Sequence, residues 1–581
     1  MYFLELAETF EKMQSTSSRL ELTAHLAELL KKTPPKIIDK TIYLIQGKLG
    51  PGYESKELGI AEKIAIKSVA LASGYSIKEI ESQYNNIGDL GEVAFKILNQ
   101  KLQKTLFFEK ITIEKLYETL LKISSLTGSG SLDLKLKYIN SLLNNATNLE
   151  SKFILKLILN NLRLGIADYT VLDAMAITFT GSKKNRKILE AAYNVSSDLG
   201  KIAKILSTGS LGDIQSIQIS IFVPVRPMLA ERVRDANEAM EKMNGPCYVE
   251  DKIDGERIQL HKKNGKIELF TRSLENITSN FSDILDEFNK LNIKDIIAEG
   301  EVVSIDLTTG KFLPFQNLMH RRRKYNIEEA IKDYPVIINF FDILFYDNKD
   351  ITSLPFSQRR EILEETFNFK SKKIRIINQV KASTPEEIEG FMEKSIKSGS
   401  EGVMVKNPNS IYRAGAREWS WVKLKKEYAN ELSDTIDLVI VGALYGKGRR
   451  VGRYGALLLA SYDKNDDIFY TITKVGTGFT DQLLEEISEK LKNHVIRNKH
   501  PRINAGGIKM DVWFEPKIVI EIHSPEITLS PIYTTALNKV KEGYGLALRF
   551  PKFTGKIRED KKAEDATSTA EIEQIFKRQI K

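Results

Sequence analysis

The sequence predicts a multidomain protein in which an all-helical N-terminal part precedes a mixed α and β part and a small C-terminal β-barrel. The chain has 581 residues, which is too long for one hydrophobic core. Apolar residues recur every three or four positions up to about residue 220, whereas later segments alternate with a period of two. We therefore expect three domains, at residues 1–222, 223–430 and 431–581.

Composition, charge and cysteine content narrow the classes of function. The chain is 42% hydrophobic and 28% charged, which is typical of a globular protein. We expect a cytoplasmic protein without a membrane partner, because no stretch is apolar enough to span a bilayer and residues 1–8 do not resemble a signal peptide. The only cysteine, Cys247, excludes disulfides and paired-cysteine zinc sites, so any metal must be a hard cation held by oxygen ligands. The net charge of +9 favours a polyanionic partner without proving one.

Residues 1 to about 220 are predicted to be helical. Leu155, Ile158, Leu159 and Leu162 show the apolar spacing of a helix face. The segment 127–131, Thr-Gly-Ser-Gly-Ser, has two interpretations. It is either a flexible connection, which is the simpler reading, or a tight turn whose backbone N–H groups face a phosphate.

Strand patterns begin after a proline-stiffened connector at 223–228. The alternating runs 257–261 and 267–271 flank the sequence Lys-Asn-Gly-Lys, and Asn-Gly between such runs is a strong hairpin signal. Lys252 is therefore expected at the end of the strand before this hairpin. The last strand expected in this part covers residues 419–425.

The C-terminal part is predicted to be a barrel of the oligonucleotide-binding (OB) type. A strand at 437–445 leads into the glycine-rich basic loop 446–452, and short strands continue to about residue 550. One helix is expected near 480–493. The charged tail from Arg558 onward is expected to end in a short amphipathic helix.

The main candidate for chemistry is Lys252, which lies between acidic residues in the run 250–255, Glu-Asp-Lys-Ile-Asp-Gly. A lysine amine is nucleophilic only when it is deprotonated, and nearby cations favour the neutral amine. Lys423 and Lys425 alternate on a late strand and so share one face, and two arginines lie on the hairpin. Such a pocket would both activate Lys252 and hold phosphates. The tetrapeptide Lys-x-Asp-Gly also occurs by chance, so the surrounding motifs decide whether it marks a catalytic lysine.

That context is an ordered set of motifs along most of the chain. After Lys252-Ile-Asp254-Gly255-Glu-Arg257 come Arg272 with Glu275, Glu299-Gly-Glu301, Phe340-Phe341-Asp342-Ile343, Glu401-Gly-Val-Met404-Val-Lys406 and Trp421-Val-Lys423-Leu-Lys425. Further blocks are Gly88-Asp-Leu-Gly91, Gly128-Ser-Gly-Ser131, Leu162-Arg163-Leu-Gly165, Tyr445-Gly-Lys-Gly-Arg449-Arg450 and Arg549-Phe-Pro551-Lys-Phe553. Together they resemble the ATP-dependent DNA ligases, most closely the archaeal branch of that family.

The resemblance implies a helical DNA-binding domain, a nucleotidyltransferase (adenylation) domain and an OB-fold domain, and a reaction in three steps. Lys252 would attack the α-phosphate of ATP and become lysyl-AMP. The AMP would then pass to a 5′-phosphate at a nick, and the neighbouring 3′-hydroxyl would attack and release AMP. Nick sealing of this kind serves replication, repair and recombination.

The resemblance also implies a role for each motif residue. Glu250 would accept a hydrogen bond from the adenine amino group, and Phe341 would stack on the base. Glu301 and Glu401 would contact ribose or Mg²⁺, with Mn²⁺ as an alternative metal. The other ATP-binding residues would be Arg257, Arg272, Arg417, Lys423 and Lys425, and Arg558 and Lys561 would orient the leaving pyrophosphate.

The implied partner is nicked duplex DNA, bound through its backbone by a monomeric enzyme. The candidate DNA-binding residues are Gly128, Ser129, Gly130, Ser131, Arg163, Arg449 and Arg450. Gln103, Phe107 and Phe108 resemble a shortened sliding-clamp-binding peptide, although aromatics buried at the start of a helix are an equal alternative.

Three positions depart from the family pattern, and other functions share part of it. Asn276 and Glu299 stand where aspartates are common, and Thr554-Gly555-Lys556 replaces a more basic run. An RNA-capping guanylyltransferase or an RNA ligase would also carry Lys-x-Asp-Gly and a following barrel, but neither requires the helical part. A non-catalytic nucleic-acid-binding protein would leave the acidic and basic pocket residues unexplained. An NAD-dependent ligase is disfavoured, because the cysteine clusters of its zinc finger are absent.

Overall fold

The computed structural model describes the chain in two compact units, Met1–Lys426 (unit 1) and Glu427–Lys581 (unit 2). The residues outside the description are 17, 55, 100–108, 163, 165, 234, 292, 309, 314–316, 319, 322–325, 370, 426–434, 447–451, 497, 560 and 581. The division of unit 1 near residue 222 into two domains stays a prediction.

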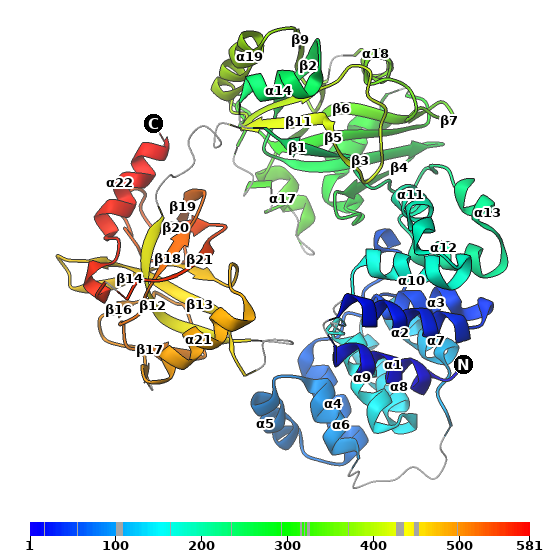
Figure 1. The fold of residues 1–581 in the computed structure, drawn as a ribbon, viewed down its shortest axis with the longest axis vertical. Helices are drawn as coiled ribbons and strands as arrows, with labels where there is room; N and C mark the ends of the chain where they lie inside the picture. Colours follow the sequence, from blue (N-terminus) through cyan, green and yellow to red (C-terminus); the bar gives the residue numbers. More distant parts are fainter. Residues whose placement is uncertain are drawn as a thin grey trace. The chain divides into compact units, whose positions relative to one another are not determined.

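The first part of unit 1 is helical, as the sequence predicts (Figure 1). Its α-helices are α1 (Phe3–Gln14), α2 (Arg19–Lys32), α3 (Ile38–Ile45), α4 (Glu62–Ser73), α5 (Ile77–Ile87), α6 (Leu90–Leu98), α7 (Ile113–Ser125), α8 (Ser131–Asn145), α9 (Asn148–Ile158), α10 (Asp168–Thr180), α11 (Arg186–Ser196), α12 (Leu199–Thr208) and α13 (Leu211–Gln215). Their apolar faces share one core, in which the rings of Phe10 and Phe153 lie 5.3 Å apart. None of the described helices is both long and apolar enough to cross a bilayer.

Local sequence explains how two of these helices begin. Thr147 caps α9, because its hydroxyl accepts a hydrogen bond from the Glu150 backbone while the Glu150 carboxylate accepts one from the Thr147 N–H. The turn before α8 contains Gly128 at φ +86° and Gly130 at φ +79°, values that side chains disfavour. Residues 127–131 are therefore a tight turn at a helix N-terminus, and their contact with phosphate stays a prediction.

The second part of unit 1 holds two β-sheets. One sheet has the order β1-β11-β10-β2-β9, and the other has the order β4-β3-β5-β6-β7 with β8 beside β6. The strands are β1 (Leu229–Arg232), β2 (Cys247–Lys252), β3 (Glu256–Lys263), β4 (Lys266–Thr271), β5 (Ile296–Ser304), β6 (Val336–Tyr346), β7 (Lys349–Asp350), β8 (Ile374–Ile376), β9 (Gln379–Ala382), β10 (Gly402–Lys406) and β11 (Arg417–Lys425). The helices are α14 (Ala236–Met243), α15 (Ser282–Asn289), α17 (Ile327–Asp333), α18 (Phe356–Thr366) and α19 (Pro385–Lys397).

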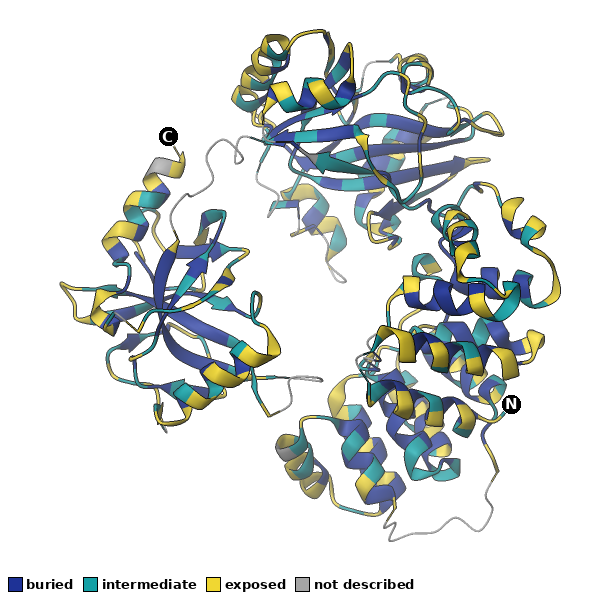
Figure 2. Ribbon diagram, viewed as in Figure 1, coloured by how far each residue is buried: buried dark blue, intermediate teal, exposed yellow. Residues whose placement is uncertain are grey.

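The strand predictions around Lys252 are confirmed. Lys252 ends β2, and β3 pairs with β4 through a turn in which Asn264 has φ +50° and Gly265 has φ +80°. Gly255 lets the chain pass β5 closely, because a Cβ there would lie 2.2 Å from the Val302 carbonyl oxygen. Figure 2 shows that both sheets are largely buried, while α14 and α19 expose their outer faces.

Unit 2 is the strand-rich part that the sequence predicts. Its main sheet has the order β15-β17-β12-β13-β14-β16, with β18 joining β12 to β21, and β19 pairs with β20. The strands are β12 (Ile436–Tyr445), β13 (Tyr454–Asp463), β14 (Ile468–Val475), β15 (Val495–Ile496), β16 (Ile503–Asn504), β17 (Val512–Phe514), β18 (Val519–His523), β19 (Glu526–Ser530), β20 (Gly545–Arg549) and β21 (Lys552–Ile557). The two expected helices are present as α21 (Asp481–Lys492) and α22 (Thr569–Ile580).

Candidate active site

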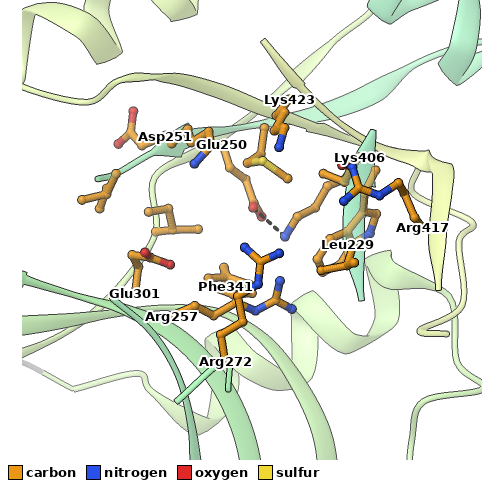
Figure 3. Close-up of a pocket in the computed structure, with 16 residues that line it drawn as sticks. Leu229, Glu250, Asp251, Arg257, Arg272, Glu301, Phe341, Lys406, Arg417 and Lys423 are labelled. Atoms are coloured by element: carbon orange, nitrogen blue, oxygen red, sulfur yellow. Dashed lines mark hydrogen bonds and ion pairs between the residues drawn. The ribbon is translucent and has the colours of Figure 1, made fainter. Parts of the chain in front are cut away.

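A cavity of about 170 Å³ in unit 1 is lined by residues from both sheets (Figure 3). It brings together most of the residues that the sequence assigns to ATP: Glu250, Lys252, Arg257, Arg272, Glu301, Phe341, Arg417 and Lys423. The sequence did not assign a role to its other lining residues: Leu229, Ala230, Asp251, Ile253, Ile377, Met404, Lys406 and Trp421. A basic, partly aromatic cavity of this kind suits a nucleotide, because it offers a ring surface for a base and cations for phosphates.

Lys252 is held by the neighbouring strand β10 and by Glu401, the residue that precedes β10. The Glu401 N–H donates to the Lys252 carbonyl oxygen at 2.9 Å. Glu401 Oε1 forms an ion pair with Lys252 Nζ, and Glu401 Oε2 accepts from Lys425 Nζ at 2.6 Å. Burial alone would raise the pKa of Glu401, but the two ammonium groups hold that pKa below its ordinary value. Glu401 is therefore a carboxylate that bridges two lysines, and Lys425 contacts it instead of lining the cavity.

Arg257 is held by the buried carboxylate of Glu299, a glutamate at a position where the family commonly has an aspartate. Arg257 Nη2 donates to Glu299 Oε2 at 2.7 Å, and Nη1 donates to the Met228 carbonyl oxygen at 2.8 Å. Glu299 Oε2 also accepts from the Tyr412 hydroxyl at 2.9 Å. Burial disfavours the charged guanidinium, yet Glu299 keeps the pKa of Arg257 above its ordinary value. Removing Glu299 would leave a buried charge unpaired, at a cost of about 3–5 kcal/mol. Glutamate at position 299 thus orients Arg257.

Glu250, the expected base-contacting residue, is itself surrounded by donors. Its Oε2 lies 2.6 Å from Lys406 Nζ, and its Oε1 accepts from Gln379 at 2.9 Å and from Arg360 at 3.4 Å. Figure 3 shows Glu250 and Lys406 pointing toward one another. Burial lowers the pKa of Lys406, and Glu250 opposes that effect. The sequence contains a signal for Lys406, since it alternates with Met404 on β10, but none for Arg360 or Gln379.

Aromatic rings stand around these buried charges. The Arg257 guanidinium lies 5.2 Å from the centroid of the Phe341 ring. Lys406 Nζ lies 4.2 Å from the Trp421 ring and 4.9 Å from the Phe341 ring. Cation–π contacts of this kind hold the rings and the cations in one arrangement. Phe341 therefore contacts both Arg257 and Lys406.

Glu301 is the most strongly perturbed acid of the cavity. Burial raises its pKa to about 7, and the nearby carboxylates Glu401 and Asp254 contribute to the rise, whereas Lys252 and Arg257 oppose it. Within the described residues, no group of three or more acidic, histidine or cysteine side chains could hold a metal. A magnesium ion nevertheless needs only one or two carboxylates when waters and substrate phosphates complete its shell. Glu301 and Glu401 fit that requirement.

The cations of the cavity crowd one another. The pKa of Lys423 is lowered by burial and by the positive charges of Lys252, Lys425, Arg417 and Arg272. The alternation of Lys423 and Lys425 in the sequence predicts that they share one face of the strand, and Lys425 is one of the charges that lower the pKa of Lys423. The excess of positive charge is what a triphosphate would neutralise.

The remaining predicted residues lie elsewhere. In unit 2, Arg558 Nη1 and Lys561 Nζ donate to one carboxylate oxygen of Asp437, at 2.6 and 2.7 Å. Gly128 to Gly130 belong to the turn before α8, and Ser131 is the first residue of that helix. The other DNA and clamp candidates, Arg163, Arg449, Arg450, Gln103, Phe107 and Phe108, lie outside the described residues.

Three ranges of the chain match profiles of known protein families. Residues 2–176 match the profile described as DNA ligase N terminus, residues 227–425 match the ATP dependent DNA ligase domain, and residues 450–561 match the ATP dependent DNA ligase C terminal region. The DNA ligase of Nitrosopumilus maritimus is 51% identical over 582 residues, which cover 100% of this chain and 99% of the relative. That of Cenarchaeum symbiosum is 50% identical and covers 100% and 98%. A solved structure titled Pmar-Lig_Pre has a TM-score of 0.52 at 19% identity, covers 95% of this chain and 99% of its own, and shares the fold.

Proposed function

This chain belongs to the family of ATP-dependent DNA ligases, and on that premise we propose how its residues carry out the sealing of a nick. As a DNA ligase it uses ATP, and its relatives do not favour RNA capping, RNA ligation or a non-catalytic role. We propose the domain ranges 1–222, 223–430 and 431–581 for DNA binding, adenylation and the OB fold. The assignments below rest chiefly on one observation: Lys252 lies at a strand end inside a cationic, aromatic cavity.

Lys252 is the proposed nucleophile. The neutral amine attacks the α-phosphorus of ATP, the bond from that phosphorus to the bridging oxygen breaks, and pyrophosphate leaves with the bonding electrons. The product is lysyl-AMP. Glu401 contacts Lys252 Nζ and stabilises its ammonium form, so this contact has to loosen and a proton has to leave before attack. Water accepts that proton, because the two ammonium groups hold the pKa of Glu401 below its ordinary value and so disfavour its protonation.

The other pocket residues bind and orient the nucleotide. Phe341 stacks on adenine, and Glu250, which Lys406 and Gln379 hold in place, accepts from the adenine amino group. Glu301 contacts the ribose. The phosphates face the cations Arg257, Arg272, Arg417 and Lys423, and Lys425, which contacts Glu401, adds a further positive charge next to them. A divalent cation, Mg²⁺ or Mn²⁺, held by Glu301 and Glu401 would supply neutralisation of phosphate charge.

Arg558 and Lys561 are proposed to orient the leaving pyrophosphate. This role requires unit 2 to approach the nucleotide during the first step, a movement of the lid type. The remaining two steps need the DNA nick and not the pyrophosphate contacts, so the demands on unit 2 change during the cycle.

Nicked duplex DNA is the proposed substrate of the last two steps. The turn at 128–131, Arg163, Arg449 and Arg450 would contact its backbone, and such contacts weaken as salt rises. We propose a cytoplasmic monomer that joins replication, repair and recombination intermediates. Gln103, Phe107 and Phe108 would bind a sliding clamp, so Phe107→Ala with Phe108→Ala should weaken clamp binding and leave sealing of isolated nicks intact. Unchanged clamp binding would refute that part.

A labelling experiment tests the proposed nucleophile. The protein is incubated with ATP labelled at the α-phosphate and then separated under denaturing conditions. The wild type should carry the label, and Lys252→Ala should carry none. Lys263→Ala is the matched control, because Lys263 also ends a strand but is exposed. An adduct on Lys252→Ala, or labelling from GTP alone, would contradict the assignment.

A further inference from the structure

Asp437 in unit 2 is a buried carboxylate that serves two cations at once. Its side chain is only 8% exposed, and its Oδ2 atom accepts from Arg558 Nη1 at 2.6 Å and from Lys561 Nζ at 2.7 Å. Arg558 and Lys561 lie 121 and 124 residues further along the chain. One oxygen therefore fixes the distance between the two charged groups that we assign to pyrophosphate.

The backbone around Asp437 is tied on both sides. The Asp437 N–H donates to the Thr567 hydroxyl at 3.1 Å, and the Thr567 N–H donates to the Asp437 carbonyl oxygen at 2.9 Å. The Arg558 N–H donates to the carbonyl oxygen of Val519 at 2.8 Å, and Val519 pairs with β12 two residues beyond Asp437. The carboxylate and the segment that carries its two partners are thus anchored to the same sheet.

Both partners of Asp437 remain partly accessible to solvent. Arg558 and Lys561 keep 17% and 31% of their side chains exposed. Both also line a cavity of about 380 Å³, together with Lys490, Lys517 and Glu559. An ammonium group has three N–H donors, so the bond from Lys561 to Asp437 does not use up that group. The arrangement suits a small polyanion that enters the cavity from the solvent side.

We propose that Asp437 is a positioning residue for the first step of ligation, one that holds Arg558 and Lys561 as a single pyrophosphate-binding pair. Without the carboxylate, the two cations repel each other and sample separate rotamers, so binding must order them at an entropic cost. The inference rests on the proposed role of Arg558 and Lys561. It predicts that a substitution of Asp437 slows lysyl-AMP formation and its reversal by pyrophosphate but does not slow the later steps of ligation.

The test compares Asp437→Asn with the wild type in three reactions of the full chain. Lysyl-AMP formation at saturating ATP should slow about tenfold, since the acceptor of both hydrogen bonds loses its negative charge and the two ion pairs are lost. The reverse reaction, in which added pyrophosphate converts lysyl-AMP back to ATP, should slow by the same factor. Sealing of a nick that already carries AMP on its 5′-phosphate should stay within about twofold of wild type.

Control variants separate positioning from folding. Asp467→Asn removes an exposed carboxylate of unit 2 that pairs with Arg502, and it should leave all three reactions unchanged. Asp437→Glu keeps the charge and should lose less than Asp437→Asn in the first two reactions. In a double-mutant cycle, Lys561→Gln should cost much less when Asp437 is already Asn, because the two residues act through one contact.

Three outcomes would overturn the inference. Equal losses in all three reactions would indicate a general structural role, and no loss in any would show that the pair positions itself. A faster first step would mean that Asp437 competes with the triphosphate. If Asp437→Asn does not fold, the ratio of the first to the third reaction in Asp437→Glu decides in the same way. Failure of the wild type to form lysyl-AMP would instead refute the proposed function itself.

Discussion

Glu401 in unit 1 and Asp437 in unit 2 are carboxylates that each bridge a pair of cations. Glu401 divides its oxygens, one for Lys252 and one for Lys425, whereas Asp437 receives both of its partners on Oδ2. In our proposal Lys252 has to leave its carboxylate in order to react, while Arg558 and Lys561 have to keep theirs in order to bind. The same local arrangement thus restrains a nucleophile in one unit and assembles a binding site in the other.

The largest effect is expected from a substitution of Lys252, the nucleophile that Glu401 holds. Lys252→Arg keeps a positive charge beside Glu401, so the ion pair survives. A guanidinium is not deprotonated near neutral pH and cannot attack phosphorus. We expect lysyl-AMP formation to fall by at least about a thousandfold, as measured by labelling with ATP. A labelled Arg variant with normal kinetics would mean that the nucleophile lies elsewhere and that the Lys252–Glu401 contact is only structural.

The two bridging carboxylates should also differ in how many steps they affect. Glu401→Gln removes charge next to the nucleophile and from the proposed metal ligands, so we expect a loss of about a hundredfold in lysyl-AMP formation. The last two steps should slow as well, because they use the same pocket. Single-turnover sealing of a pre-adenylated nick is the measurement. If Glu401→Gln spared that reaction as Asp437→Asn is expected to, the contrast between the two carboxylates would disappear.

Glu301 sharpens the comparison through pH, because its pKa is raised to about 7 whereas that of Glu401 is lowered. The carboxylate form needed for ribose or metal contact accumulates as pH rises through 7. The rate of lysyl-AMP formation should therefore increase about tenfold between pH 6 and 8, and Glu301→Gln should flatten that part of the profile. Stability has the opposite sign: a carboxyl with a raised folded-state pKa favours the folded state at low pH, and this contribution is lost as pH rises through about 7. A profile unaffected by Glu301→Gln would assign the titration to another group.

The sequence predicted the strands of the nucleotide pocket because local patterns determine them. The Asn-Gly turn and the period-two alternation predicted the hairpin, whereas the resemblance of the ordered motifs to the ligase family implied a common pocket for Lys252, Arg257, Phe341 and Lys423. Sequence order also suggested the helices α21 and α22. These features depend on neighbours a few residues apart, which a single sequence displays directly.

The partners of the pocket residues were not predictable in the same way. Arg360 and Gln379 reach Glu250 from α18 and β9, and Asp437 meets Arg558 across 121 residues. Each of these contacts depends on how distant elements pack, and an isolated arginine or aspartate in a polar segment carries no sign of it. Glu299 stood out only as a departure from the family pattern, and the structure gives it a task as the partner of Arg257.

The smallest effect is expected for a cation that lines the same cavity in unit 2 but is not bridged by Asp437. It tests whether the bridge between Arg558 and Lys561, and not positive charge alone, determines pyrophosphate binding. Lys517 lines the same cavity as Arg558 and Lys561, but its side chain is 56% exposed and its ion pair is with Glu515, at 3.5 Å. An exposed, weakly held cation contributes little to binding. We therefore expect Lys517→Ala to change the pyrophosphate dependence of the reverse reaction by no more than about twofold. Titration of preformed lysyl-AMP enzyme with pyrophosphate measures this. A loss as large as that expected for Asp437→Asn would mean that the net charge of the cavity, and not the fixed geometry set by Asp437, recognises pyrophosphate.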